Sequence, residues 1–130
     1  MTDASLVGLD LSGARLEEAV LAGAKMTYAI LQGANFYSAH MERVDLTGGV
    51  GMQGANLGTA SLQGADLNGA KLHGADLTSA GLQGANLDFA SLQGATLVDA
   101  DLEGATLFQA QLAGANLSDA NVKAADLREA

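Results

Sequence analysis

The chain contains no cysteine and no proline, and only 4% of its 130 residues are aromatic. The absence of cysteine excludes disulfides, thiolate metal ligands and a cysteine nucleophile. Without proline, nothing in the composition marks a linker, and we expect residues 1–130 to form one domain. No run approaches the roughly 18 apolar residues that a membrane-spanning helix needs, so we expect no membrane association.

Basic residues are also scarce. There are six Lys and Arg against 15 Asp and Glu, which gives a formal net charge of −9. Direct binding to nucleic acid or to an anionic membrane needs a basic surface, so the charge argues against both. Residues 1–6 have neither the basic nor the apolar segment of a signal peptide, and we therefore expect a cytoplasmic protein.

What the chain does contain is a repeat of five residues. A large apolar residue, usually leucine, recurs at this spacing, and alanine lies two residues before nearly every one. A period of five fits neither a helix nor a flat strand, and a fixed short repeat is typical of a solenoid. If both positions point inward, successive coils pair at the roughly 4.7–4.9 Å spacing of neighbouring strands. The pattern predicts a solenoid.

Units such as Ala65-Asp66-Leu67 and Ala85-Asn86-Leu87 show the motif clearly. They resemble the pentapeptide-repeat family, whose motif is A(D/N)LXX, and the likeness covers about 25 consecutive units from Ala4 to Glu129. The resemblance implies a right-handed quadrilateral β-helix, in which each unit forms one face and four units form one square coil. About six coils would then make up the chain.

The repeat has one irregularity. Between Leu46 and Met52 the large apolar position advances by six residues instead of five. The additional residue lies within residues 47–51, where three of the five residues are glycine. Glycine tolerates unusual backbone angles, so we predict a one-residue bulge at a corner near 47–51.

Assigning successive units to four faces gives expectations for the corners. Glycine follows the large apolar residue by two on every unit of the second face and on most units of the fourth. Because glycine readily adopts the positive φ of a type II turn, we predict type II corners there and type I or irregular corners after the other two faces. Glutamines stack on the same faces and either bond along the stack or simply decorate it: Gln32, Gln53 and Gln93, and Gln63 and Gln83.

The sequence contains no recognisable catalytic motif. There is no GxSxG, P-loop or HExxH segment. His40 and His73 fall on different faces, which does not suit a zinc site. Paired carboxylates would need a pocket to act as acid and base, and a filled rod offers none. We therefore expect no enzyme activity, no catalytic residue, no metal site and no cofactor.

The candidate interaction surface is acidic and partly aromatic. No Lys or Arg lies between Lys71 and Lys123, whereas six carboxylates do: Asp76, Asp88, Asp99, Asp101, Glu103 and Asp119. Outside that segment, three outward-facing residues are candidates for one apolar patch: Tyr28, Ile30 and Tyr37. The alternative is an ordinary solvated acidic surface with scattered apolar residues.

These features predict a non-enzymatic scaffold or protein-interaction module that presents a rigid acidic surface to an unknown protein partner. The family resemblance implies an alternative, since some pentapeptide-repeat proteins are similar in shape and charge to duplex DNA and inhibit or protect DNA gyrase. Gyrase-directed members form long dimers through a C-terminal module, for which this sequence contains no candidate. Solenoid ends expose apolar surface, so we expect either ends blunted by charge or an end-to-end homodimer.

Overall fold

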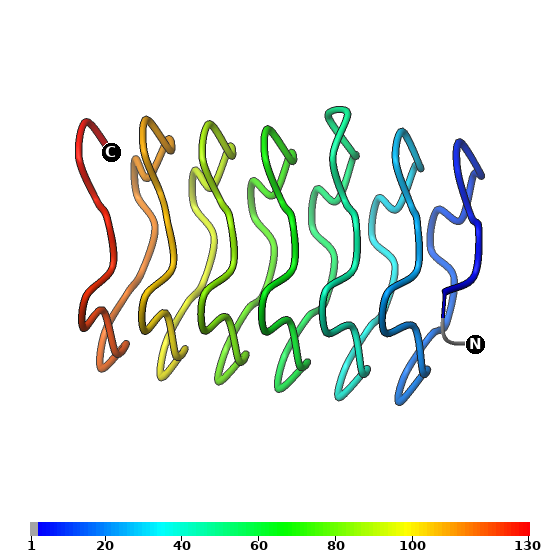
Figure 1. Ribbon diagram of the computed structural model, residues 1–130, viewed down its shortest axis with the longest axis horizontal. Helices are drawn as coiled ribbons and strands as arrows, with labels where there is room; N and C mark the ends of the chain where they lie inside the picture. The colour runs from blue at the N-terminus through cyan, green and yellow to red at the C-terminus, as the bar shows by residue number, and fades with distance from the viewer. Residues whose placement is uncertain (1–2) are drawn as a thin grey trace.

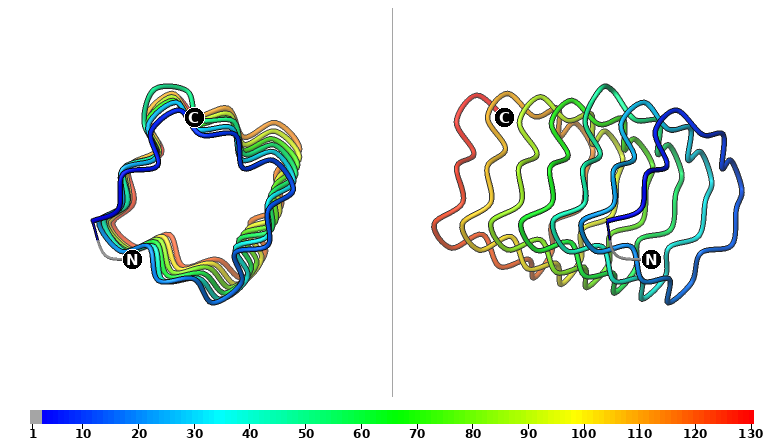
Figure 2. Two further views of the ribbon diagram at one scale, coloured as in Figure 1. Left: turned by 90° about the vertical axis from the view of Figure 1, so that its right-hand side faces the viewer. Right: turned by 45° about the vertical axis from the view of Figure 1, so that its right-hand side comes forward.

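A computed structural model describes residues 3–130, which form a right-handed rod of stacked, four-sided coils (Figure 1). The chain advances along the rod from one end to the other, and the end view shows the coils closely superimposed (Figure 2). The described residues contain no helix and no continuous strand. Each five-residue unit instead has one residue in a parallel β-bridge, followed by a turn. The all-β quadrilateral helix expected from the sequence is confirmed.

The bridges fix the register of the coils. The bridged residue is the one before the large apolar residue, and it pairs with its equivalents in the coils before and after. On the first face this ladder runs through Ser5, Lys25, Asp45, Asp66, Asn86, Thr106 and Asp126. Ladders of the same kind begin at Asp10 on the second face, Arg15 on the third and Val20 on the fourth. Residues one coil apart therefore form columns along the rod.

Backbone hydrogen bonds explain why a unit of five residues is stable. In the unit 75–79, the N–H of Asp76 donates to the preceding coil (2.9 Å), and the N–H groups of Leu77 and Ser79 donate to the following coil (2.7 and 2.8 Å). The N–H of Ala75 closes the turn behind it (2.9 Å). Backbone carbonyl groups thus accept hydrogen bonds from four of the five N–H groups of the unit. This matters because a buried N–H without a hydrogen-bond partner costs free energy.

The fifth N–H explains the acidic or amide residue of the motif. The side chain of Asp76 accepts the N–H of Thr78, two residues on, at 2.9 Å. Asn56 does the same for Gly58 (3.0 Å) and Asn116 for Ser118 (3.0 Å). Asp and Asn are suited to this local turn because their short side chains reach the backbone two residues on. The motif therefore satisfies all five backbone donors of a unit.

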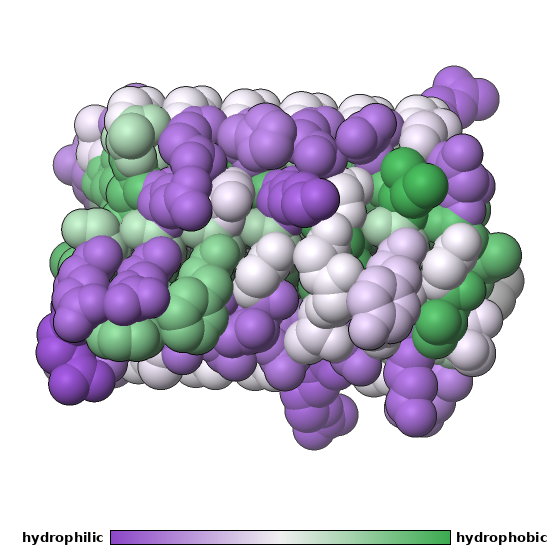
Figure 3. Space-filling model, turned by 90° about the horizontal axis from the view of Figure 1, so that it is seen from above, coloured by the Kyte–Doolittle hydropathy of each residue, from purple (hydrophilic) through white to green (hydrophobic). Residues whose placement is uncertain are grey.

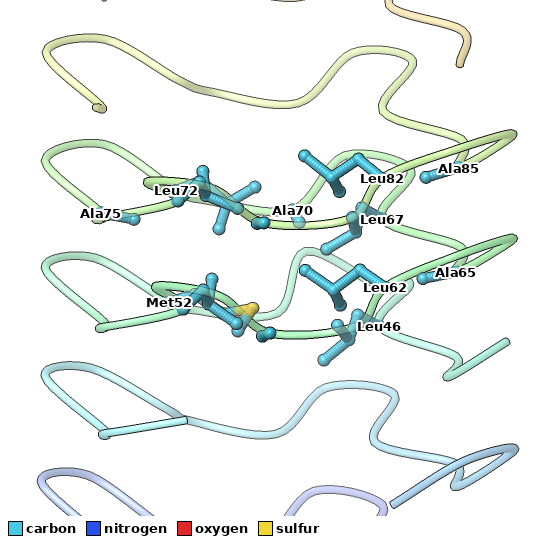
Figure 4. Packing of buried hydrophobic residues seen from close by; sticks show 14 of the residues in the cluster. Leu46, Met52, Leu62, Ala65, Leu67, Ala70, Leu72, Ala75, Leu82 and Ala85 are labelled. Atoms are coloured by element: carbon cyan, nitrogen blue, oxygen red, sulfur yellow. The ribbon is translucent and has the colours of Figure 1, made fainter. Parts of the chain in front are cut away.

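The core is a narrow column of alternating large and small side chains. From Met26 to Leu107, the large residue of every unit is fully buried, and alanine or valine two residues before it is buried as well. Figure 4 shows equivalent side chains stacked in successive coils, such as Leu62 and Leu82, or Ala65 and Ala85. This dry stacking leaves the remaining three positions of each unit for turns and surface.

The predicted bulge lies where the sequence placed it. Gly48 and Gly49 both have positive φ, at 76° and 73°, and the turn hydrogen bond found in the neighbouring units is missing here. The bridges absorb the additional residue, since Ile30 pairs with Gly51, whereas Lys25 pairs with Asp45. The bulge protrudes from one corner without changing the register of the later coils (Figures 1 and 2).

The prediction that two kinds of corner alternate is wrong. The third turn residue has positive φ after all four faces, and 13 of these residues are not glycine, including Tyr28 (61°), Arg43 (54°) and Phe89 (60°). The N–H of this residue donates to the next coil at most corners, glycine or not, as Ser79 does, and this pairing needs the same backbone geometry each time. The ladder imposes one backbone geometry everywhere and overrides the local preference of the side chain.

Both ends of the rod expose core positions. Leu9, which takes the place of a core alanine, is 45% exposed, and Leu127 at the other end is 38% exposed. The large residues between these ends, from Met26 to Leu107, are fully covered. The end-to-end homodimer stays a prediction.

Candidate functional site

Four of the six candidate carboxylates come together at one corner of the rod, after the third face. Asp99 and Asp119 occupy the same corner position in consecutive coils, and the Asp99 N–H donates to the carbonyl of Ser118 at 3.0 Å. Asp101 and Glu103 follow on the adjoining fourth face. We name Asp99, Asp101, Glu103 and Asp119 the acidic corner.

Asp101 is the most firmly held member of the acidic corner. Its Oδ1 accepts Asn121 Nδ2 at 2.9 Å and the backbone N–H of Glu103 at 3.1 Å, and its Oδ2 accepts Gln83 Nε2 at 2.5 Å. These donors come from three successive coils. The carboxylate is therefore fixed in position by the neighbours of its own column.

The other members of the acidic corner project into solvent. Asp99, Glu103 and Asp119 are exposed. Glu103 Oε1 lies 3.5 Å from Lys123 Nζ, an exposed pair of the kind that contributes little to stability. Within residues 3–130, no hydrogen bond or ion pair engages the carboxylates of Asp99 and Asp119. The acidic corner thus carries more negative charge than the chain itself neutralises.

The remaining two carboxylates lie elsewhere. Asp76 is on the third face, where both the N–H and the hydroxyl of Thr78 donate to it (2.9 and 2.6 Å). Asp88 lies at the end of the first face, and its Oδ1 accepts the N–H of Phe108 from the next coil at 2.9 Å. The six carboxylates therefore do not form a single surface.

The expected apolar patch is also divided. Tyr28 lies at the corner after the first face, 66% exposed, and its ring covers Gly48 so closely that a Cβ there would lie 2.6 Å from Cε1. Ile30 follows it on the second face. Tyr37 lies on the third face and covers Gly58 in the same way, with a Cβ distance of 3.2 Å. Tyr28 and Ile30 therefore lie on either side of one corner, whereas Tyr37 lies on a different face.

A second aromatic group lies on the same corner as Tyr28, nearer the C-terminus. The rings of Phe89 and Phe108 meet edge to face, with centroids 5.8 Å apart and planes at 86°. The Arg128 guanidinium lies over Phe108, 5.9 Å from the ring centroid. Two hydrogen bonds join it to Asp126 (2.7 and 2.8 Å) and raise the pKa of Arg128, with a smaller contribution from Asp88. The sequence register places Tyr28, Phe89 and Phe108 at or near one corner, but sequence reasoning missed the contact with Arg128, although Phe108 and Arg128 are equivalent positions of consecutive coils.

The glutamine columns do not bond along their own stacks. Gln83 donates to Asp101, and Gln93 donates to Gln111, so each reaches the bridge position of the next coil. The buried Oε1 atoms of four residues accept no hydrogen bond from the described part of the chain: Gln53, Gln63, Gln83 and Gln93. These side chains cover the second and fourth faces with amide groups that link neighbouring coils diagonally.

Residues 3–130 enclose no pocket. Over the same residues, no three His, Cys, Asp or Glu side chains are grouped so that they could hold a metal ion. His40 pairs with Glu42 across 3.6 Å, a contact that the sequence analysis did not anticipate. No helix long and apolar enough to cross a membrane occurs in the described residues.

Comparisons with known proteins extend these observations. A family model described as pentapeptide repeats, in eight copies, matches residues 4–43, 52–78, 73–109 and 107–130. The structure of HetL, a pentapeptide-repeat protein of the cyanobacterium Nostoc sp. strain PCC 7120 involved in regulating heterocyst differentiation, is 29% identical, with a TM-score of 0.41; the match covers 98% of this chain and 84% of HetL. Another Nostoc pentapeptide-repeat protein, alr5209, is 34% identical over 66% of this chain and 62% of its own, with a TM-score of 0.48. QnrB1, a plasmid-mediated fluoroquinolone resistance protein, is 19% identical over 96% of this chain and 78% of its own, with a TM-score of 0.41. A search of curated proteins found no match.

Proposed function

The chain belongs to the pentapeptide-repeat family, and from this premise we propose that it is a non-enzymatic protein-interaction module whose acidic corner binds a basic protein partner. The observation that carries the proposal is the gathering of Asp99, Asp101, Glu103 and Asp119 on one corner, with Lys123 as their only cationic contact within residues 3–130. A concentrated field of one sign attracts an oppositely charged partner and speeds its encounter.

Rigidity supports the same proposal. The backbone of the acidic corner is held by ladder hydrogen bonds of 2.8–3.0 Å, such as those of Leu102 and Gly104 to the next coil. A partner that binds such a surface does not have to order a loop first, and binding is stronger when the surface is pre-formed. The carboxylates are spaced by the coils themselves, which favours a partner with a regular basic face.

The experiment compares three baits in affinity capture from a lysate of the source organism. The first is the wild type, and the second carries Asp99→Lys, Asp101→Lys and Glu103→Lys. The third reverses Asp10, Glu17 and Glu18, which occupy the same three repeat positions near the N-terminus. The net charge changes equally in both variants, so only the location differs.

The proposal expects a partner that the wild type and the N-terminal variant capture, that the acidic-corner variant loses, and that elutes with salt. Capture of the same proteins by all three baits would overturn it. Circular dichroism of the three baits checks that each is folded. The gyrase alternative stays a prediction from the family resemblance, and a supercoiling assay with purified DNA gyrase, run with and without the chain, decides it directly.

A further inference from the structure

Phe89 occupies a position where a bulky residue is unfavourable. Its φ is +60°, and glycine takes the same corner position in other coils, at Gly8 and Gly69. Left-handed backbone is disfavoured for residues with a Cβ, so glycine would relieve the corner. Yet the Phe89 side chain is 48% exposed and gains one edge contact with Phe108. The ring of Phe89 is therefore open to a binding partner.

The neighbouring coil shows how this corner receives a guanidinium. Arg128 lies over the ring of Phe108 at 5.9 Å while its Nε and Nη2 bond to Asp126. An aromatic face and a carboxylate together form a good binding site for arginine, because the planar guanidinium can stack on the ring and hydrogen-bond to the carboxylate at the same time. The chain thus contains one such binding site, formed by Phe108 and Asp126, and its own Arg128 occupies it.

A carboxylate and an aromatic ring also lie together at Phe89, and within residues 3–130 no cation lies over that ring. Asp88 precedes the ring, and one of its oxygens accepts the N–H of Phe108, which fixes the carboxylate beside the aromatic pair. Arg128 is the basic residue beside this corner, but its guanidinium stacks on Phe108 and bonds to Asp126, so it leaves the ring of Phe89 uncovered. Figure 3 shows the corner as an apolar area beside hydrophilic residues, toward the C-terminal end. We name Asp88, Phe89 and Phe108 the aromatic corner.

We propose that the aromatic corner binds an arginine side chain of a protein partner, with the guanidinium stacked on the exposed ring of Phe89 and paired with the Asp88 carboxylate. The proposal rests on the proposed function in one respect, that the chain is an interaction module. It concerns a different surface, because the corner after the first face is diagonally opposite the acidic corner. The rod would then offer two separate edges to basic partners.

The test uses two fluorophore-labelled peptides of equal charge, acetylated hexa-arginine and hexalysine, titrated with the protein and followed by fluorescence anisotropy. Phe89→Gly removes the ring and suits the local backbone, so the fold is retained. Gln109→Gly is the matched control, because Gln109 takes the same corner position one coil further on, with φ of +54°. The acidic-corner reversal of Asp99, Asp101 and Glu103 forms the third variant.

We expect the wild type to bind hexa-arginine about fivefold more tightly than hexalysine, because arginine stacks on aromatic rings and lysine is more strongly hydrated. Phe89→Gly should remove that preference, while Gln109→Gly keeps it. The acidic-corner variant should weaken both peptides and keep the ratio. Equal binding of the two peptides by the wild type, or a ratio unchanged in Phe89→Gly, would overturn the aromatic corner and leave the acidic corner untouched.

Discussion

Replacing a central leucine tests whether each coil rests on its two neighbours. Leu77 is fully buried, and the bridges of Asp76 place it between the coils of Asn56 and Thr96. Leu77→Ala removes three carbon atoms from a column that is closed on both sides. Leu117, in the last complete coil, has a neighbour on one side and is only partly buried.

The magnitude follows from burial and from the cavity. Losing three buried carbon groups costs roughly 2.4 kcal/mol in transfer free energy. The ladder prevents the surrounding coils from closing the gap, so a cavity contribution is added and Leu77→Ala should cost about 3–4 kcal/mol. At Leu117 the transfer contribution is about half and solvent fills the space, so we expect about 1–2 kcal/mol.

Urea unfolding followed by circular dichroism measures both changes, fitted with a nearest-neighbour scheme because solenoids depart from two-state behaviour. Leu77→Met is the control, since Met52 already occupies an equivalent buried position, and it should cost less than about 1.5 kcal/mol. If Leu117→Ala lowers the free energy of unfolding as much as Leu77→Ala or more, the idea that each coil is covered by its two neighbours would be refuted.

Three further predictions concern single positions. Gly48→Ala should destabilise the chain by more than about 1 kcal/mol in thermal unfolding, because φ is +76° and the new Cβ would meet the Tyr28 ring, and an unchanged melting temperature would contradict this. Burial raises the pKa of Asp45, but hydrogen bonds from Thr47 and other neighbours lower it overall, so Asp45 stabilises the fold above its ordinary pKa and loses this effect as pH falls through the folded value. Thr47→Val should therefore destabilise the chain at pH 7, and its difference from the wild type in thermal unfolding should shrink as the pH is lowered; a difference that stays constant with pH would contradict this. If rods associate end to end, the mass measured by light scattering should rise with protein concentration, and the variant Leu127→Lys should keep the mass of a monomer. A wild-type mass that does not change with concentration would exclude association.

The register of the fold could be predicted because it depends on side chains that repeat. The five-residue spacing placed the core correctly from Met26 to Leu107, and the step between Leu46 and Met52 located the bulge. These are properties of the spacing itself, which the stacked coils preserve.

The backbone conformation of the corners could not be predicted because it depends on hydrogen bonds to the neighbouring coil. Local preference suggests type II geometry only where glycine occurs, yet Tyr28 and Phe89 share its positive φ. The side chains that reach between coils were missed for the same reason. Gln83 bonds to Asp101, and Arg128 covers Phe108, and neither contact is visible until residues about one coil apart are placed side by side.

The candidate surface was predicted in composition and not in arrangement. Acidic residues were found as a run along the sequence, but a solenoid distributes neighbouring residues over different faces. Asp88 thus lies diagonally opposite Asp99, and Tyr37 lies on another face from Tyr28. Residues spaced by one coil, such as Asp99 and Asp119, form a surface in this fold, whereas a continuous segment does not.

Carboxyl footprinting of the chain with its captured partner tests the acidic corner most directly. Solvent-exposed carboxylates are labelled with an amine and a carbodiimide, and mass spectrometry compares each site with and without the partner. The account predicts that Asp99, Glu103 and Asp119 lose reactivity in the complex while Asp10 and Glu18 keep it. Unchanged labelling of the acidic corner, with protection at other carboxylates, would contradict it.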